Sequence, residues 1–140
     1  MRDGKYEEQQ ACLRLKIDMT HPNPCMRDPV AYRIKKMPHP HVGDKWIIYP
    51  TYDYTHCLID SFEWITHSCC TLEFEIRRDV YYWILQNLEL YRPYQWEFSR
   101  LNISNTILSK RYIQEMVDTN IISGWDDPRI FTLMALKRRG

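Results

Sequence analysis

The sequence has no apolar run that approaches the roughly 18 residues needed to cross a bilayer, and it has no internal repeat or low-complexity segment. Charge of one sign is not in excess either, because 19 Lys and Arg residues stand against 18 Asp and Glu residues. A net charge of +1 provides no field that would attract a polyanion over the whole surface. Any contact with nucleic acid must therefore come from a local basic patch, and residues 137–139, Lys-Arg-Arg, form the most concentrated one.

The five cysteines form no disulfide framework, because their number is odd and their spacing is irregular. Reduced thiols and a cytoplasmic location are therefore expected, and the opening residues 1–4 do not resemble a signal peptide. No CxxC or HxxxH spacing supports a structural zinc site. His67, Ser68 and Cys69 beside Cys70 could suggest a nucleophile, but no acidic orienting residue accompanies them, so buried packing is the favoured interpretation.

The chain is long enough, at 140 residues, for one folded domain, and its 14% aromatic content argues against disorder. Hydrophobic periodicity predicts strands at 13–19, 30–34, 45–49, 65–70 and 95–101, and helices at 58–64, 74–88, 112–119 and 132–137. The apolar side predicted for the 74–88 helix comprises Phe74, Arg77, Tyr81, Ile84 and Leu85, widened by Ile76, Val80, Trp83 and Leu88. The first three strands suggest a small antiparallel sheet. The later strand–helix–strand order is typical of an α/β layer.

The octet NTILSKRY, residues 105–112, places a Ser-Lys-Arg triplet directly before a helical pattern. Cations at a helix start oppose the helix dipole, which favours anions there. Basic side chains together with the free N–H groups of a helix start make a good seat for a phosphate. From these residues alone, a phosphate seat and a solvated loop both stay open.

Five sequence blocks, in this order and spacing, resemble the glutaminyl-tRNA synthetase family over essentially the whole chain. They are MRDPVAYRI (26–34), KWIIYPTYDYTHCLIDSFEWITHSCCTLEF (45–74), QWEFSRLN (95–102), ILSKR (107–111) and GWDDPR (124–129). ILSKR is similar to that family's form of the class I KMSKS loop, with Leu108 at the usual Met and Arg111 at the second Ser. In GWDDPR, Asp126-Asp127 is expected to cap a turn around Pro128, with Arg129 toward RNA phosphate.

The resemblance implies an α/β fold, namely the second half of a class I synthetase dinucleotide-binding (Rossmann-like) catalytic domain. It implies the end of the acceptor-stem-binding insert at 1–50, the second half of the nucleotide-binding fold at 51–100, and a helical subdomain with the KMSKS-like loop at 101–140. The family's HIGH signature and the acidic residue for the substrate amino group lie upstream of such a segment. The chain is therefore expected to be an internal fragment that is inactive when isolated.

The activity that the resemblance implies is ATP-dependent activation of L-glutamine to glutaminyl-adenylate, followed by transfer to the 3′ end of tRNA(Gln). ATP with Mg²⁺ would be the nucleotide substrate, with no metal bound by the protein itself. The implied partners are the tRNA acceptor end and the remainder of the synthetase chain, with no membrane. A sister enzyme, glutamyl-tRNA synthetase, and a non-catalytic tRNA-binding fragment are the alternatives. YTHCLIDSFEWITHSCCTLEF favours the glutamine branch.

The resemblance also implies roles for individual residues. The glutamine pocket would contain Tyr52, Cys70 and Gln95. The ATP-binding positions would be Thr71, Arg100, Leu101, Leu108, Ser109 and Lys110. The KMSKS-like motif comprises Ile107, Leu108, Ser109, Lys110 and Arg111, with Ser109 and Lys110 as its catalytic residues. A Lys on this loop would stabilise the charge that grows on departing pyrophosphate.

Overall fold

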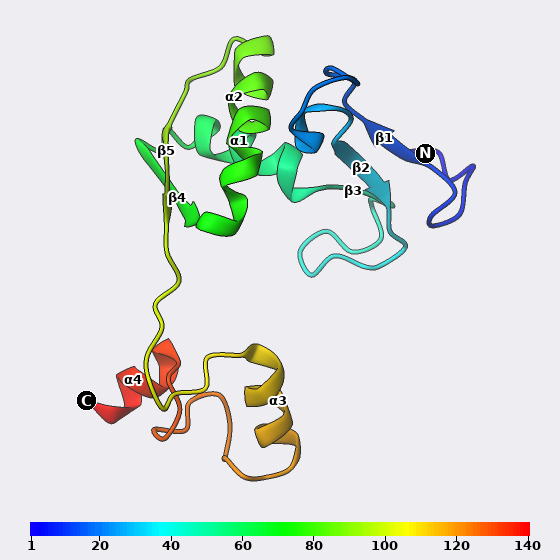
Figure 1. Cartoon of the computed structure of the whole chain (residues 1–140). Coiled ribbons are helices and arrows are strands. Elements are labelled where there is room, and N and C mark those ends of the chain that lie inside the picture. The colour runs from blue at the N-terminus through cyan, green and yellow to red at the C-terminus, as the bar shows by residue number, and fades with distance from the viewer. The chain divides into compact units, whose positions relative to one another are not determined.

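A computed structural model describes residues 1–140, which divide into two compact units, Met1–Ser99 and Arg100–Gly140 (Figure 1). The first unit contains all five strands and the second contains two helices. No helix in either unit combines the length and the apolar character that a membrane span requires.

The first unit begins with the predicted antiparallel sheet. Its strands, in the order in which they pair, are β1 (Cys12–Arg14), β2 (Val30–Ile34) and β3 (Ile48–Pro50). The prediction of β1 as residues 13–19 was too long, because the pairing register shifts between Leu13 and Arg14. Beyond that irregularity the backbone of Leu15 and Ile17 still donates to Pro29 and Arg27, but outside a regular ladder. A short 3₁₀ helix, η1 (Pro24–Met26), interrupts the connection to β2.

Helix α1 (Tyr52–Phe62) begins six residues earlier than the predicted start at residue 58. Thr51 occupies the extended N-cap position, and its backbone N–H donates to the Ala31 carbonyl in β2 at 2.9 Å. Asp53 lies in the first turn, where a carboxylate is favoured by the helix dipole. The aromatic and β-branched residues at the helix start had obscured this boundary.

The predicted strand–helix–strand unit is confirmed, with parallel strands β4 (His67–Thr71) and β5 (Tyr94–Phe98). The connection differs from the predicted single helix at 74–88. It starts with a 3₁₀ helix, η2 (Leu72–Arg77), and only then continues as α2 (Arg78–Asn87). The second strand ends at Phe98 and not at residue 101.

The core of this unit lies between α1 and α2. Its buried residues are Cys57, Val80, Tyr81, Ile84 and Leu85. The last four were on the apolar side predicted for the 74–88 segment, so that face is confirmed. Ile76 and Leu88 were assigned to the same side but are half exposed, because they lie in η2 and at the C-cap of α2.

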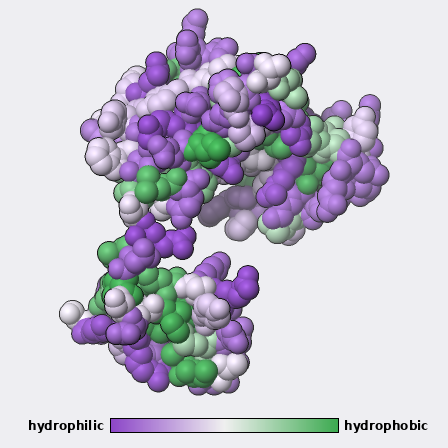
Figure 2. Space-filling model, in the orientation of Figure 1, coloured by the Kyte–Doolittle hydropathy of each residue, from purple (hydrophilic) through white to green (hydrophobic).

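The second unit contains α3 (Lys110–Asp118) and α4 (Leu133–Arg139) around a small core of Ile113, Ile122, Ile130 and Ala135. Both helices were predicted, but Lys110 and Arg111 belong to the first turn of α3 and not to a preceding loop. Thr132 caps α4, since its hydroxyl accepts from the Ala135 N–H at 3.0 Å. Figure 2 shows hydrophobic residues gathered on the visible face of this unit. The exposed apolar side chains of the unit include Leu133 and Met134.

Candidate active site

The first unit carries a shallow depression where α1, η2, α2 and β5 meet. It is lined by Tyr52, Asp53, His56, Phe74, Arg77, Tyr81 and Gln95. Two of the predicted pocket residues, Tyr52 and Gln95, are therefore brought to the same place. The enclosed space is only about 10 Å³, so these residues form an open wall and not a complete pocket.

Tyr52 is held in this wall by aromatic contacts. Its ring stacks on His56, one helical turn later, with 4.9 Å between centroids, and lies 5.0 Å from the ring of Phe74. The side chain remains 46% exposed, so a ligand can reach it. Burial and the neighbouring Cys70 and Asp60 raise the pKa of Tyr52, which keeps the phenol protonated and able both to donate and to accept.

A polar network lies behind Tyr52 and was not predicted from the sequence. Asp60 Oδ2 accepts hydrogen bonds from Ser68 Oγ at 2.6 Å and from the Tyr81 hydroxyl at 3.0 Å, and it lies 3.0 Å from His56 Nε2. Burial and the charge of Asp60 raise the pKa of Tyr81 well above its ordinary value. The four-residue spacing of His56 and Asp60 was the available signal, but the predicted helix began after His56.

Cys70 and Gln95, which the resemblance assigns to the glutamine pocket, lie on neighbouring strands and contact each other. Gln95 Nε2 donates to Cys70 Sγ at 3.5 Å. Burial raises the pKa of the Cys70 thiol, which therefore stays protonated at neutral pH. Gln95 Oε1 is buried without a hydrogen-bond partner in the protein. Thr71, which follows Cys70, ends β4 and takes the N-cap position of η2.

Two arginines at the start of α2 are paired with carboxylates. Arg77 binds Asp53 in the depression, and its guanidinium lies 5.5 Å from the centroid of the Phe74 ring. Arg78 forms a bidentate pair with Glu97. Its Nε donates to Oε1 at 2.9 Å, and its Nη2 donates to Oε2. The side chain of Glu97 is only 1% exposed, so this carboxylate depends on its partner.

The remaining predicted residues, from Arg100 and Leu101 onward, belong to the second unit, which begins at Arg100. Ser109 takes the N-cap position of α3, and its side chain makes no cap hydrogen bond. Lys110 and Arg111 lie on the exposed polar side of α3. Ile107 is exposed and Leu108 is partly buried. The N-terminus of α3 thus combines unsatisfied backbone N–H groups with two basic side chains, as a phosphate seat requires.

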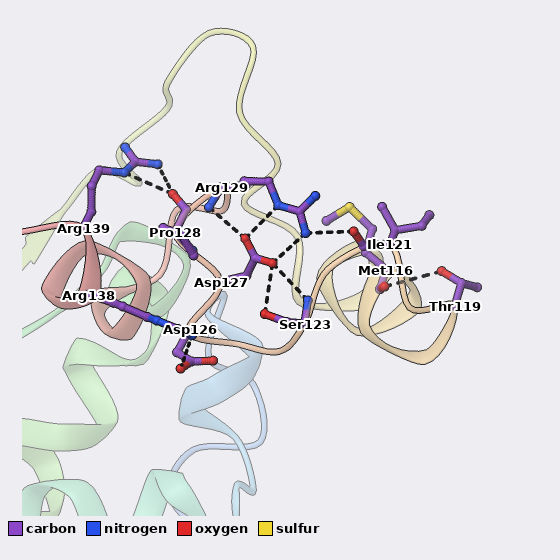
Figure 3. A network of polar contacts seen from close by, with 10 residues as sticks. All are labelled: Met116, Thr119, Ile121, Ser123, Asp126, Asp127, Pro128, Arg129, Arg138 and Arg139. Atoms are coloured by element: carbon purple, nitrogen blue, oxygen red, sulfur yellow. Dashed lines mark hydrogen bonds and ion pairs between the residues drawn. The ribbon is translucent and has the colours of Figure 1, made fainter.

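The GWDDPR segment folds around the buried Asp127 (Figure 3). Its carboxylate accepts from the Ser123 N–H and the Arg129 N–H, both at 3.0 Å, so the expected turn cap is confirmed. The guanidinium of Arg129 binds Asp127 and the Ile121 carbonyl, and its contact with RNA phosphate stays a prediction.

The predicted basic patch at residues 137–139 is also used internally. Arg138 pairs with Asp126 at 2.8 Å, and Arg139 donates to the Pro128 carbonyl (Figure 3). Two of the three cations therefore contact the turn before α4.

Comparison with known proteins identifies the family. Residues 1–140 match the family model described as tRNA synthetases class I (E and Q), catalytic domain, and the chain belongs to this family. It is 63% identical over all 140 residues to a protein of Dictyostelium discoideum named probable glutamine–tRNA ligase, and 59% identical over the same length to the glutamine–tRNA ligase of Lupinus luteus. The chain spans 18% of the length of each of these two relatives, and 25% of the glutamine–tRNA ligase of Idiomarina loihiensis, to which it is 55% identical.

Proposed function

We propose that the complete protein containing this chain is a glutamine–tRNA ligase. It would activate L-glutamine with ATP to glutaminyl-adenylate and transfer the aminoacyl group to the 3′ end of tRNA(Gln). The observation that carries the proposal is the 54–63% identity, over the whole chain, to proteins that bear this name in amoeba, plants, yeasts and nematode. The family itself includes glutamate enzymes, so the amino acid rests on these relatives and on the pocket wall.

The three predicted segments receive separate roles in this proposal. Residues 1–50 form the end of the insert that holds the tRNA acceptor end, and residues 51–100 form the second half of the Rossmann-like nucleotide fold. Residues 101–140 form the helical subdomain with the KMSKS-like loop. The change from an antiparallel sheet to a parallel β4–α2–β5 unit after Pro50 supports the first boundary.

The glutamine side chain would meet Tyr52, Cys70 and Gln95. The Tyr52 hydroxyl can accept from the substrate amide, and the unpartnered Gln95 Oε1 is a second acceptor for an N–H group. A buried acceptor without a partner costs about 1–3 kcal/mol, so a ligand donor there would bind favourably. An amide has two N–H donors to offer and a carboxylate has none. This donor count favours glutamine over glutamate at the wall.

The ATP contacts are assigned to Thr71 in the first unit and to Arg100, Leu101, Leu108, Ser109 and Lys110 in the second. In the proposed first step, a carboxylate oxygen of glutamine attacks the α-phosphorus of ATP. The new oxygen–phosphorus bond forms as the bond to the β-phosphate bridging oxygen breaks, and pyrophosphate departs with the electron pair. The Lys110 ammonium, at the N-terminus of α3, stabilises that growing charge.

Mg²⁺ would accompany ATP in this reaction. It usually keeps several waters and binds through substrate phosphates with one or two carboxylates. The metal is assigned to the ATP complex. The remaining partners are the tRNA acceptor end and the rest of the synthetase chain. A cytoplasmic location is proposed, in keeping with an Arabidopsis thaliana relative that is named as cytoplasmic.

The test is tRNA charging by the complete protein with ATP, purified tRNA(Gln) or tRNA(Glu), and labelled glutamine or glutamate. We expect glutaminyl-tRNA(Gln) as the main product. Formation of glutamyl-tRNA(Glu) in its place would assign the protein to the glutamate branch of the same family. Absence of both products, with tRNA binding retained, would favour a non-catalytic tRNA-binding protein.

A further inference from the structure

Arg77 is the only Lys or Arg among the residues that line the depression. Its guanidinium lies over the Phe74 ring, and that ring contacts Tyr52, so the positive charge is close to the aromatic residue assigned to the substrate amide. Arg77 is also bound by Asp53, which is the neighbour of Tyr52 in the first turn of α1. The cation and its counter-charge therefore lie at the same wall.

A cation at this wall creates a specificity problem. Glutamine and glutamate have nearly the same shape, and they differ mainly in the charge of the side-chain end group. An unpaired guanidinium binds a carboxylate through two parallel charge-assisted hydrogen bonds, which are among the strongest hydrogen bonds in proteins. A site for a neutral amide must therefore prevent such a pair, and selective sites often do so with an added repulsive group.

We propose that Asp53 is a specificity-determining positioning residue, which occupies Arg77 and so denies the carboxylate of glutamate a cationic partner beside Tyr52. This inference rests on the proposed function and adds to it a residue that acts against the competing amino acid. Asp53 acts in two ways. It occupies the hydrogen-bonding edge of the Arg77 guanidinium, and its own negative charge repels a second carboxylate.

The local structure holds Asp53 in place for this role. The preceding Thr51 is anchored to β2 through the Ala31 carbonyl, and the helix dipole favours a carboxylate in this first turn. The side chain of Asp53 is 21% exposed and that of Arg77 is 40% exposed, so the pair is at the rim, where an entering side chain would meet it.

The next arginine is neutralised in the same manner. Arg78 is bound bidentately by Glu97, which lies opposite Cys70 in the β4–β5 register. Both guanidinium groups near the residues assigned to the amide are therefore paired with carboxylates from other elements. This arrangement fits a site that selects a neutral side chain.

The decisive experiment is tRNA charging by the complete enzyme carrying Asp53→Asn. Asn keeps the shape of Asp53 but removes its charge, so Arg77 becomes available to a carboxylate. We expect the ratio of kcat/KM for glutamate to that for glutamine to rise about tenfold, which corresponds to about 1.4 kcal/mol. The double variant Asp53→Asn with Arg77→Gln should return the ratio toward that of the unsubstituted enzyme.

A matched control is Asp28→Asn, which breaks the exposed pair between Arg14 and Asp28 outside the depression and should leave the ratio unchanged. Asp53→Ser provides a second neutral variant if Asp53→Asn does not fold. Equal changes for both amino acids would mean that Asp53 is only structural. A raised ratio that persists without Arg77 would likewise overturn the proposal. If the unsubstituted enzyme charges no glutamine, the proposed function fails, and this inference fails with it; an unchanged ratio in Asp53→Asn, with glutamine still charged, overturns this inference alone.

Discussion

The carboxylate of Asp127 holds Arg129 through three hydrogen bonds. Oδ1 accepts from the Arg129 backbone N–H at 3.0 Å and from Nε at 2.9 Å, while Oδ2 accepts from Nη2 at 2.7 Å (Figure 3). These bonds, with the donors of Ser123, hold the pKa of Asp127 far below its ordinary value. One buried carboxylate therefore organises the turn that leads into α4.

The first prediction concerns the stability of this turn at low pH. Because the pKa of Asp127 is lower in the folded state, the carboxylate stabilises the turn above about pH 4, the ordinary Asp range, and that stability is lost as the pH falls toward the folded value. Asp127→Asn should weaken the turn at pH 7 and reduce this pH dependence. The measurement is hydrogen exchange of the Ser123 and Arg129 amides in the complete enzyme, corrected for intrinsic rates.

Asp126→Asn is the control for this experiment, because its pair with Arg138 is about half exposed and surface pairs contribute little. It should change the protection of the two amides much less than Asp127→Asn does. Equal protection in the parent and the Asp127→Asn enzyme would show that the turn does not depend on the carboxylate.

Arg77 shows most clearly which part of the site cannot be predicted from the sequence. A helix at 74–88 places Arg77 on the same stripe as Phe74 and Tyr81, facing the core. In the structure, residues 72–77 are a 3₁₀ helix, which turns 120° per residue instead of 100°, so the phase of the stripe changes before α2 begins. Arg77 consequently reaches Asp53, 24 positions away, and periodicity carries no information about such a contact.

Other structural elements could be predicted from the sequence because they depend on local sequence patterns. The strand at 30–34 and the apolar face of α2 follow from period-2 and period-3.6 rules, and both elements are present, although the buried residues of β2 are Ala31 and Ile34, which do not alternate. The network of Asp60, Ser68 and Tyr81 joins α1, β4 and α2, so it exists only after these elements pack. Long-range polar contacts of this kind depend on tertiary geometry.

The second prediction is that this 140-residue polypeptide, expressed alone, does not charge tRNA and self-associates. The outer face of the β4–β5 pair exposes Tyr94, Trp96 and Phe98, and parallel sheets are normally covered on both faces. Light scattering should detect association, and Trp96→Glu should reduce it, whereas Tyr6→Glu, an exposed aromatic outside these strands, should have little effect. Glutaminyl-tRNA formation above a mock-purified control would contradict this expectation.

The third prediction concerns amino-acid binding. In the complete enzyme, Tyr52→Phe should weaken glutamine binding by about 0.5–1.5 kcal/mol, since it removes one hydrogen-bonding hydroxyl while keeping the aromatic stack with His56. The KM for ATP should be nearly unchanged. Steady-state charging with each substrate varied in turn gives both values.

Tyr49→Phe is a matched control, because it also removes a hydroxyl, one that donates to the Met37 carbonyl outside the depression. It should leave glutamine binding as it is in the parent enzyme. A loss of ATP use without a loss of glutamine binding in Tyr52→Phe would remove Tyr52 from the amino-acid pocket.

The last prediction concerns Lys110, at the first position of α3. In the complete enzyme, Lys110→Ala should slow adenylate formation far more than it weakens glutamine binding, because the ammonium meets charge that grows only as pyrophosphate departs. Removing one well-placed transition-state donor typically costs on the order of 10²–10³ in rate. Lys110→Arg should restore part of that rate, since a planar fork replaces a compact charge poorly.

Arg111→Ala is the matched comparison, because it removes a neighbouring cation from the same helix turn. It should reduce the rate less than Lys110→Ala, since its position in the KMSKS-like motif corresponds to the second Ser of the wider class. Rapid-quench measurement of adenylate formation with tRNA(Gln) present, beside equilibrium glutamine binding, separates the chemical step from substrate binding. A parent rate in Lys110→Ala would mean that this helix start does not act on the ATP phosphates and is a solvated surface.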